Sequence, residues 1–432
     1  MAMDALFSPL TVQLVGAVIV AGVVLQVGVM LYSSWRRSTH MRQQHELSLD
    51  ILRANVAAAS AHSKVEHDRA TLFWNGVRRF RIQRKVPESR NVSSFYLVAH
   101  DGKPLPPFQP GQYLTFQLKI SGRQKPVVRC YSLSESPFQR EYYRVTIKRL
   151  PPPPDKPDAP PGLSSSFFHD RLNEGDILDV KAPNGHFYLD LRKNTPVVLI
   201  GGGIGVTPVL SMLNAVCASG SKREVWFFYG VYHGGDHIMK GHLERLAREN
   251  ENVRLHVCYS DPLPEDVEGR DFQHRGFVSV ELFKRLLPSN NYKFFLCGPP
   301  PMAESITNGL AEWGVPDRDV YFEAFGPATI KRTKRRLIGE YPAGEEGSAI
   351  EIVFAKSGKT LKWDPSAGSL LEFAENNDIV IDCGCRVGNC GTCVTAVKSG
   401  EVTYINEPGS SPEDGSCLTC ISVPKTDLVL EA

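Results

Sequence analysis

The sequence has almost no net charge and few cysteines for its length. Formal net charge is +2 over 432 residues, so the chain lacks the concentrated positive charge of nucleic-acid-binding proteins, and we expect no nucleic-acid partner. Ten cysteines are too sparse at this length for a secreted disulfide protein, and several stand singly in apolar segments, as buried thiols do. The composition therefore favours a reducing compartment, and the length allows three or more domains.

The N-terminus lacks lysine and arginine as far as residue 35. A cleaved signal peptide has a basic start and a short apolar core, whereas this chain carries Asp4 and is then almost continuously apolar over residues 10–32. Such a run is long enough to cross a bilayer as a helix. Arginines follow it at once, and basic residues mark the cytoplasmic side. We expect a single-pass anchor over residues 1–36 in the cell inner membrane, with the catalytic domains in the cytoplasm.

A barrel is predicted after the anchor. Residues 37–76 are polar and free of proline, which favours a helical connector. From residue 77 short runs of β-forming residues alternate with turn residues, and this pattern predicts an antiparallel β-barrel over residues 77–193.

One strand of this barrel contains Arg129, Tyr131 and Ser132. Arg129 and Tyr131 are two positions apart and so project to one face, with Ser132 on the other. We interpret the strand as a flavin seat, with Tyr131 against the ring, Arg129 on phosphate and Ser132 on the flavin or its ribityl chain. An ordinary barrel strand with a mixed surface is the alternative.

A run of small hydroxyl residues follows a proline-rich stretch. Gly162, Ser164 and Ser165 open a segment that continues with apolar residues. Free N–H groups at the start of a helix favour an anion, so this turn is a candidate pyrophosphate site. A serine that only caps the helix is the alternative.

Residues 194–327 have the pattern of an α/β domain with a parallel sheet. A glycine-rich turn between its first strand and first helix suits a dinucleotide pyrophosphate. A second loop after a later strand, Cys297-Gly298-Pro299, stands where open α/β sheets bind ligands. The candidate nucleotide-binding residues are Gly202, Gly203, Gly205, Thr207, Pro208, Gly298 and Pro299.

Four cysteines near the C-terminus have the spacing of an iron–sulfur site. Cys385, Cys390 and Cys393 stand at C-x4-C-x2-C, and Cys420 is the fourth candidate. This is the plant-type spacing for a [2Fe–2S] cluster. A disulfide, or a zinc site built from two C-x2-C pairs that would include Cys417, is the alternative. The surrounding residues 348–432 fit a small α+β module of the β-grasp type, joined by a basic linker at 328–347.

Together these motifs make a family resemblance. In order, Arg129-x-Tyr131-Ser132, the two glycine-bearing loops and Glu323-x-Phe325 resemble the ferredoxin–NADP reductase superfamily, and the segment after Gly162 resembles the reductase half of flavohaemoglobins, which holds FAD. The cysteine segment resembles plant-type ferredoxins, so the layout is similar to reductase components of multicomponent oxygenases. The resemblance implies that Cys297 lies near the nicotinamide, and Glu323 and Phe325 near the flavin, as the catalytic candidates.

The resemblance implies an electron-transfer function but does not identify the final electron acceptor. It implies a reductase that passes electrons from NADH through FAD and a [2Fe–2S] cluster to a redox partner protein such as an oxygenase, desaturase or haem protein. A quinone reductase and a membrane-tethered redox sensor are the alternatives. The membrane anchor is unusual for soluble oxygenase reductases. We expect NADH rather than NADPH, because Asp261 follows the third strand of the nucleotide domain and a carboxylate suits a free ribose hydroxyl.

Overall fold

The computed structural model describes two units of the chain, Met1–Ala70 and Thr71–Ala432. The described residues are 13–37, the single residues 41, 49 and 68, and 71–432 apart from internal gaps at 124–125, 153–156, 324, 326–349, 385, 387, 389–390, 406–407 and 409–411. The expected basic linker lies outside the described residues, and so does most of the expected helical connector.

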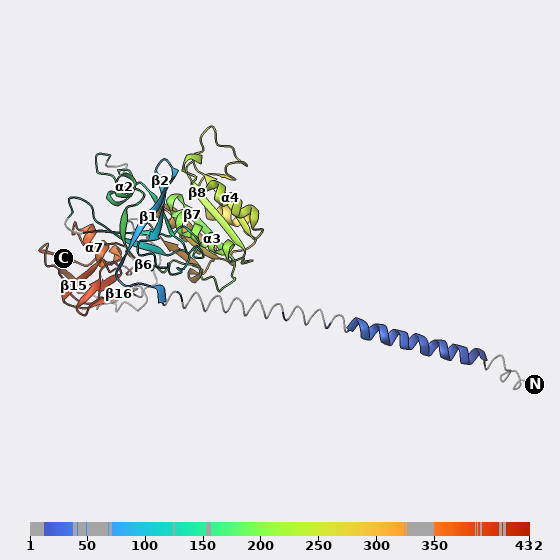
Figure 1. The fold of residues 1–432 in the computed structure, drawn as a ribbon. Helices are drawn as coiled ribbons and strands as arrows, with labels where there is room; N and C mark the ends of the chain where they lie inside the picture. The colour runs from blue at the N-terminus through green and yellow to red at the C-terminus, as the bar shows by residue number, and fades with distance from the viewer. Residues whose placement is uncertain are drawn as a thin grey trace, which may run out of the picture. The chain divides into compact units, whose positions relative to one another are not determined.

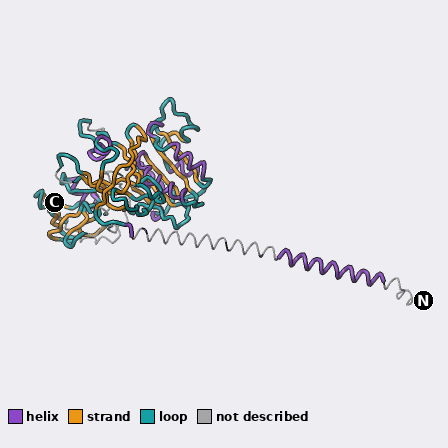
Figure 2. Tube along the Cα trace, in the orientation of Figure 1, coloured by secondary structure: helices purple, strands orange, loops and turns teal. Residues whose placement is uncertain are grey.

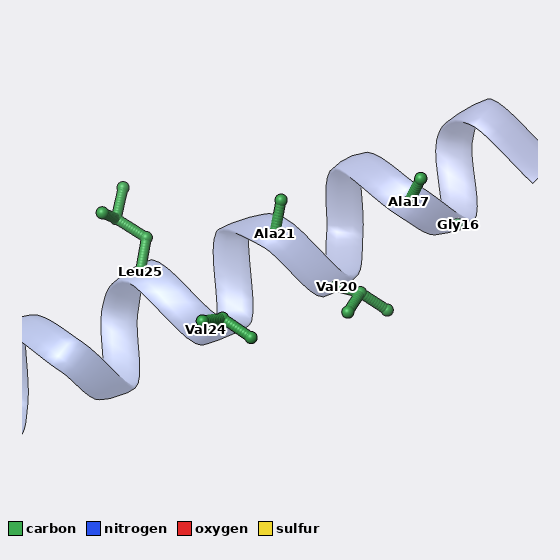
Figure 3. Close-up of a pocket in the computed structure, with 6 residues that line it drawn as sticks. All are labelled: Gly16, Ala17, Val20, Ala21, Val24 and Leu25. Atoms are coloured by element: carbon green, nitrogen blue, oxygen red, sulfur yellow. The ribbon is translucent and has the colours of Figure 1, made fainter.

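Among the described residues of the first unit there is one long apolar helix, Gln13–Arg37, of 25 residues and mean hydropathy 2.6. It is drawn in blue in Figure 1 and as the long purple helix in Figure 2. Figure 3 shows part of this helix, with the small or branched apolar residues Gly16, Ala17, Val20, Ala21, Val24 and Leu25. Its apolar side chains are exposed, with Leu25 at 71%. By length and composition the helix is able to cross a membrane.

The first domain of the second unit is a closed antiparallel sheet. Its strand order is β4-β3-β6-β1-β2-β5, and a bridge between Leu133 and Val145 joins the two edge strands. Alternate residues point inward, so that Phe80, Phe95 and Phe116 are fully buried with Phe168 of the one described helix of this domain. The expected barrel is thereby confirmed. The bounds are β1 Val77–Ser89, β2 Val92–Ala99, β3 Tyr113–Leu118, β4 Val127–Ser132, β5 Tyr143–Lys148, α2 Leu163–Asp170 and β6 Ile177–Asn184.

The second domain is a parallel sheet with helices on both faces. Its strand order is β10-β9-β8-β7-β11-β12, with parallel pairing throughout. The central strands are continuously buried, because apolar cores cover both faces of the sheet. The order reverses between β7 and β11, which is where such sheets bind ligands. The elements are β7 Val197–Gly202, η1 Gly203–Gly205, α3 Val206–Ala218, β8 Val225–Val231, η2 Gly234–Asp236, α4 Lys240–Glu249, β9 Val253–Tyr259, β10 His274–Arg275, α5 Val280–Leu286, β11 Lys293–Cys297, α6 Pro300–Glu312, η3 Asp317–Asp319 and β12 Val320–Glu323.

In the described part of the third domain, a small mixed sheet is covered by one short α-helix, α7. Its larger sheet has the order β14-β13-β19-β15-β17, and β16 pairs with β18. Leu370 and Phe373 of the helix pack with Ile352 and Phe354 of the sheet. This is the expected α+β module. The bounds are β13 Glu351–Phe354, β14 Lys359–Lys362, η4 Pro365–Ala367, α7 Leu370–Asn376, β15 Val394–Ser399, β16 Val402–Tyr404, β17 Ser416–Leu418, β18 Ser422–Pro424 and β19 Leu428–Leu430.

Candidate functional site

The candidate flavin strand is β4, at the edge of the barrel sheet next to β3. The Tyr131 ring makes edge contacts with the rings of Phe116 and Phe168, with centroids 5.7 and 5.1 Å away. Burial raises the pKa of Tyr131, so its hydroxyl is not ionised at neutral pH. Arg129 is exposed and donates a hydrogen bond to the Val128 carbonyl at 2.7 Å. Tyr131 and Arg129 therefore lie on one strand as expected, with the guanidinium available to an anion.

The serines at the start of α2 divide into two kinds. The Ser165 hydroxyl donates to the Gly162 carbonyl at 3.0 Å and accepts from the Leu150 N–H at 3.1 Å, so it closes the turn. The hydroxyls of Ser164 and Ser166 are buried and have no hydrogen-bond partner among the described residues. Buried hydroxyls of that kind need a partner, and a phosphate would supply acceptors. The site therefore fits an anionic cofactor. The sequence named Ser164 and Ser165, and it missed Ser166.

The two nucleotide loops of the second domain pack directly against each other. A Cβ on Gly202 would meet the Met302 sulfur and the Pro299 ring, and one on Gly205 would meet the Cys297 carbonyl. Glycine is thus required at Gly205, where a side chain would strike backbone atoms, whereas at Gly202 the Met302 side chain would have to move. β7 and β11 are neighbours, with Gly201 beside Cys297, so the two motifs meet at the carboxyl edge of the sheet. Thr207 donates to the Ile204 carbonyl at 3.1 Å and, with Pro208, is buried at the start of α3.

A buried carboxyl lies where the first two domains meet. Glu323 ends β12 beside Cys297 of β11. Burial raises the pKa of Glu323 to about 8, and a hydrogen bond with Ser132 of β4 opposes this shift. Its Oε2 atom is buried without a hydrogen-bond partner among the described residues. The carboxyl therefore holds a proton at neutral pH and presents an unused oxygen.

Cys297 and Phe325 complete this group of catalytic candidates. Cys297 is fully buried, and burial raises the pKa of its thiol, with the Glu323 carboxylate acting in the same direction. It is therefore a neutral thiol rather than a nucleophilic thiolate. Phe325 is 37% exposed just beyond β12. An exposed aromatic ring there is able to cover a flat cofactor.

Two of the four expected cluster ligands converge. Cys393 and Cys420 are both buried, with their sulfurs 3.1 Å apart. The backbone N–H of Gly388 donates to the Cys420 sulfur at 3.3 Å, which is the kind of bond that tunes an iron–sulfur centre. Gly388 has a φ of +74°, and a Cβ there would strike Ile421. Cys385 and Cys390 lie outside the described residues. The sulfur arrangement fits a cluster wrapped tightly by the backbone.

The two remaining cysteines of this module have other surroundings. Cys417 belongs to the apolar core with Phe373, and burial raises the pKa of its thiol to about 11. Cys383 is half-buried, 3.6 Å from the Arg386 guanidinium, which in turn pairs with Glu375. Burial raises the pKa of Cys383, whereas Arg386 and Arg129 of the flavin strand lower it. The cluster segment thus lies within electrostatic reach of the candidate flavin strand.

Hydrogen bonds join the loops that follow β8 and β9, where we expect the adenosine end of the nucleotide. The backbone N–H of Asp261 donates to the Tyr232 carbonyl at 2.8 Å. The Asp266 carboxylate accepts from the N–H groups of Leu263 and Gly234 at 2.8 and 3.1 Å, a role that was not predicted from the sequence. Arg254 does not enter this loop, because it stacks on Trp226 and pairs with Glu224. Asp261 therefore remains the exposed charged residue that follows β9.

Comparison with known protein families agrees with this geometry. Family models match for the oxidoreductase FAD-binding domain at residues 79–188, the oxidoreductase NAD-binding domain at residues 199–308, and the 2Fe-2S iron-sulfur cluster binding domain at residues 354–425. The chain is therefore an oxidoreductase that combines FAD-binding, NAD-binding and 2Fe-2S domains of the ferredoxin reductase type. The expected set of FAD, NAD and 2Fe–2S domains in this reductase is thereby confirmed.

The similar proteins each align with only part of this chain. The flavohemoprotein of Halalkalibacterium halodurans is 39% identical over 255 residues, which are 59% of this chain and 61% of that protein. The FAD/NAD-binding domain of nitric oxide dioxygenase from Vibrio cholerae O1 biovar El Tor aligns with 59% of this chain and all of its own (100%), at 29% identity and a TM-score of 0.52. An intact type IV self-sufficient cytochrome P450 monooxygenase shares the fold over 82% of this chain and 41% of its own, at 23% identity and a TM-score of 0.52. The chain spans less than two thirds of the length of the curated relatives it matches.

Proposed function

We propose that this chain is a membrane-anchored, NADH-dependent reductase that delivers single electrons to a separate redox protein such as an oxygenase, a desaturase or a haem protein. The observation that carries the proposal is the meeting of three sites. Glu323 of the nucleotide domain hydrogen-bonds Ser132 of the flavin strand. The positive charge of Arg129 on that strand lowers the pKa of Cys383, beside the cluster segment. These two interactions support a path from nucleotide to flavin to cluster, with the flavin strand between the other two sites.

The cofactors supply the redox chemistry of this path: hydride from NADH, conversion to single electrons at FAD, and one-electron transfer at the [2Fe–2S] centre. The protein's residues seat and orient them. Tyr131 and Phe325 would hold the flavin ring, and Arg129, Ser164 and Ser166 its phosphates. The packed glycine loops would let the backbone approach the nucleotide pyrophosphate closely.

Glu323 would hold a proton on its carboxyl group next to the position of hydride transfer. Its carboxyl is protonated at neutral pH because burial raises its pKa to about 8. A neutral carboxyl is able to donate a hydrogen bond from Oε2, whereas an ionised one would repel added negative charge on the ring system. Cys297 would pack as a neutral, compact side chain against the nicotinamide, since its pKa is raised.

The cluster would sit between Cys385, Cys390, Cys393 and Cys420. The converging sulfurs of Cys393 and Cys420 support this ligand set, and the N–H of Gly388 would stabilise the negative charge on sulfur. In flavohemoproteins the matched reductase segment is part of a longer protein, whereas this chain carries a 2Fe-2S domain at residues 354–425. We therefore place the acceptor on a separate molecule.

The proposal has a direct test on the full chain purified in detergent. We expect flavin absorbance, about two irons per chain, and rapid NADH-dependent reduction of both ferricyanide and cytochrome c. Protein that lacks both flavin and iron would overturn the proposal. Slow reduction without turnover would favour a redox sensor instead, and rapid reduction of a soluble quinone in place of protein acceptors would favour a quinone reductase.

The membrane assignment is tested separately. The helix Gln13–Arg37 supports a single-pass anchor in the inner membrane with the catalytic domains in the cytoplasm. Deleting residues 1–36 should give a soluble protein that still reduces ferricyanide at the wild-type rate. Reporter fusions that place the C-terminal domain outside the cytoplasm would contradict the topology, because NADH is a cytoplasmic reductant.

A further inference from the structure

A polar stripe runs along one face of the otherwise apolar helix α3. Thr207, Ser211 and Asn214 are spaced i, i+4 and i+7, so they share a face. Ser211 is fully buried and Asn214 is 5% exposed. Buried polar side chains need hydrogen-bond partners. Those of Ser211 and Asn214 lie across the domain boundary, on the segment that continues the candidate flavin strand.

The contacts across the boundary are specific. Ser211 Oγ donates to the Glu135 carbonyl at 2.7 Å, and Asn214 Nδ2 donates to the Ser134 carbonyl at 3.1 Å. Ser134 is two residues beyond Ser132, which hydrogen-bonds Glu323. The nucleotide domain therefore holds the end of the flavin strand from two elements, α3 and β12.

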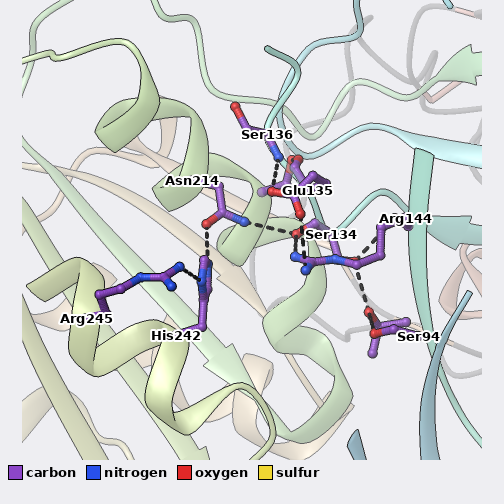
Figure 4. Close-up of polar contacts among 10 residues, drawn as sticks. Ser94, Ser134, Glu135, Ser136, Arg144, Asn214, His242 and Arg245 are labelled. Atoms are coloured by element: carbon purple, nitrogen blue, oxygen red, sulfur yellow. Dashed lines mark hydrogen bonds and ion pairs between the residues drawn. The ribbon is translucent and has the colours of Figure 1, made fainter. Parts of the chain in front are cut away.

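The barrel holds the same segment from its own side. Arg144 of β5 donates from Nη2 to the Ser134 carbonyl at 2.7 Å and from Nε to the Ser134 hydroxyl at 3.1 Å. Its Nη1 pairs with Glu135 Oε2 at 3.1 Å, with the Arg144 side chain 7% exposed. Figure 4 shows these groups converging on Ser134. Because Arg144 satisfies the Ser134 carbonyl, the bond from Asn214 is additional and its loss leaves no orphaned acceptor.

A histidine fixes which way the Asn214 amide points. An arginine can only donate, so Arg245 Nη2, 2.9 Å away, requires His242 Nδ1 to accept. His242 Nε2 then carries the proton and donates to Asn214 Oδ1 at 2.6 Å. A reversed amide would set two donors together at His242 and two acceptors together at Ser134. The chain Arg245–His242–Asn214–Ser134 therefore has one direction (Figure 4).

We propose that Asn214, oriented by His242, is a positioning residue for hydride transfer: it fixes helix α3, which carries the nucleotide-binding glycine turn, against the strand that carries the flavin. The inference rests on the proposed function, since it concerns the step from NADH to FAD. α3 begins where the glycine turn ends, so a shift of the helix moves the bound nucleotide relative to the flavin. A displacement of about 1 Å at a reacting centre is able to cost on the order of a hundredfold in rate.

The charges around His242 agree with a neutral, directional ring. Burial lowers its pKa, and the positive charges of Arg144 and Arg245 lower it further, while Glu135 and Glu249 oppose them. The ring is therefore uncharged at neutral pH, as the acceptor role of Nδ1 requires.

The test is rapid mixing of the full-length holoenzyme with NADH, followed at the flavin absorbance. In Asn214→Leu and His242→Leu we expect the limiting rate of flavin reduction to fall about tenfold or more, with less than a twofold change in the apparent Kd of NADH. Flavin and iron content, and reduction of the cluster by dithionite, should match wild type. His242→Gln, which also donates to Asn214, should restore most of the rate.

Ser219→Ala is the matched control, because the Ser219 hydroxyl bonds the Val216 carbonyl within α3 and not the flavin domain. If Asn214→Leu loses FAD, then His242→Leu and Ser211→Ala provide the same rate measurement. An unchanged limiting rate in the variants that retain FAD would overturn the proposal, and so would a loss confined to NADH affinity. Absence of flavin reduction in the wild type would instead reject the proposed function.

Discussion

The sulfur atoms of Cys393 and Cys420 lie 3.1 Å apart across a sequence separation of 27 residues. Hydrogen bonds between side chains and the backbone hold both ends of this pair, since the Thr419 hydroxyl donates to the Cys393 carbonyl at 3.0 Å and the Gly388 N–H donates to the Cys420 sulfur. Such an arrangement brings two of the four expected cluster ligands close enough to share one metal centre.

Replacing any of Cys385, Cys390, Cys393 or Cys420 by serine should abolish the visible and electron paramagnetic signals of the cluster, while NADH still reduces the flavin. Cys417→Ser and Cys383→Ser are the matched controls and should retain the signals, because Cys417 packs in the apolar core. Loss of the signals in Cys417→Ser with normal signals in Cys420→Ser would show that the fourth ligand is Cys417.

Glu323 should make the folded state less stable as pH rises. Its pKa is raised from 4.5 to about 8, so between these values the folded state holds a proton that the unfolded state releases. This stabilising contribution is complete below pH 4.5 and is lost as pH rises to about 8, by about 1.4 kcal/mol for each pH unit at most. Glu323→Gln cannot ionise and should remove this slope.

Thermal unfolding of the FAD-loaded protein between pH 6 and 9 measures the difference. Wild type should lose stability relative to Glu323→Gln up to about pH 8, and the two curves should then run parallel. Glu304→Gln, at an exposed position on α6, is the control for removing a carboxylate. Parallel curves over the whole range would mean that Glu323 is ionised at neutral pH.

The serines of α2 should separate cofactor binding from folding. Ser164→Ala and Ser166→Ala should each weaken FAD retention by about tenfold, the usual loss for a hydrogen bond to a charged group, with unchanged stability of the FAD-free protein. Ser165→Ala should instead lower stability by about 1 kcal/mol, because its hydroxyl closes the turn between Leu150 and Gly162. Equilibrium dialysis of FAD and urea unfolding distinguish the two effects. If Ser165→Ala instead weakened FAD binding and the other two variants lowered stability, the FAD phosphates would lie at Ser165.

The coenzyme preference should depend on Asp261. We expect kcat/KM to be higher for NADH than for NADPH, because the 2′-phosphate would meet the Asp261 carboxylate and gain no charge-assisted bond. Asp261→Arg should lower the ratio of kcat/KM for NADH to kcat/KM for NADPH by about tenfold or more. Arg254→Ala should leave it unchanged, since Arg254 is engaged by Trp226 and Glu224. A wild-type preference for NADPH would refute the assignment.

The sequence predicted the fold well where local pattern decides structure. Alternation placed Arg129 and Tyr131 on one strand face, and the glycine turn after a buried run predicted the loop at Gly202. The cysteine spacing led to Cys420, whose sulfur the structure brings to Cys393. These features depend on backbone periodicity and on glycine conformation, which are local properties.

The parts that could not be predicted depend on contacts between distant elements. Ser164, Ser165 and Ser166 differ only in which way a short helix turns them. Nothing in the chain near Arg254 indicated that Trp226 would hold it. The stripe of Ser211 and Asn214 had a visible signal, polar residues at helical spacing in an apolar helix, but its partners at residues 134–135 are set by domain packing alone.

The position of β19 in the third domain has a consequence for biogenesis. β19 lies between β13 and β15 in the sheet, yet it follows every other described strand in sequence. β13 and β15 therefore have no shared neighbour until residues 428–430 have left the ribosome, whereas the barrel and the nucleotide domain are complete much earlier. Flavin loading can accompany synthesis of the chain, whereas the sheet of the 2Fe-2S domain is completed only when this late strand is added. Cells that translate the protein faster than they supply iron and sulfide should accumulate a flavin-loaded, cluster-free form.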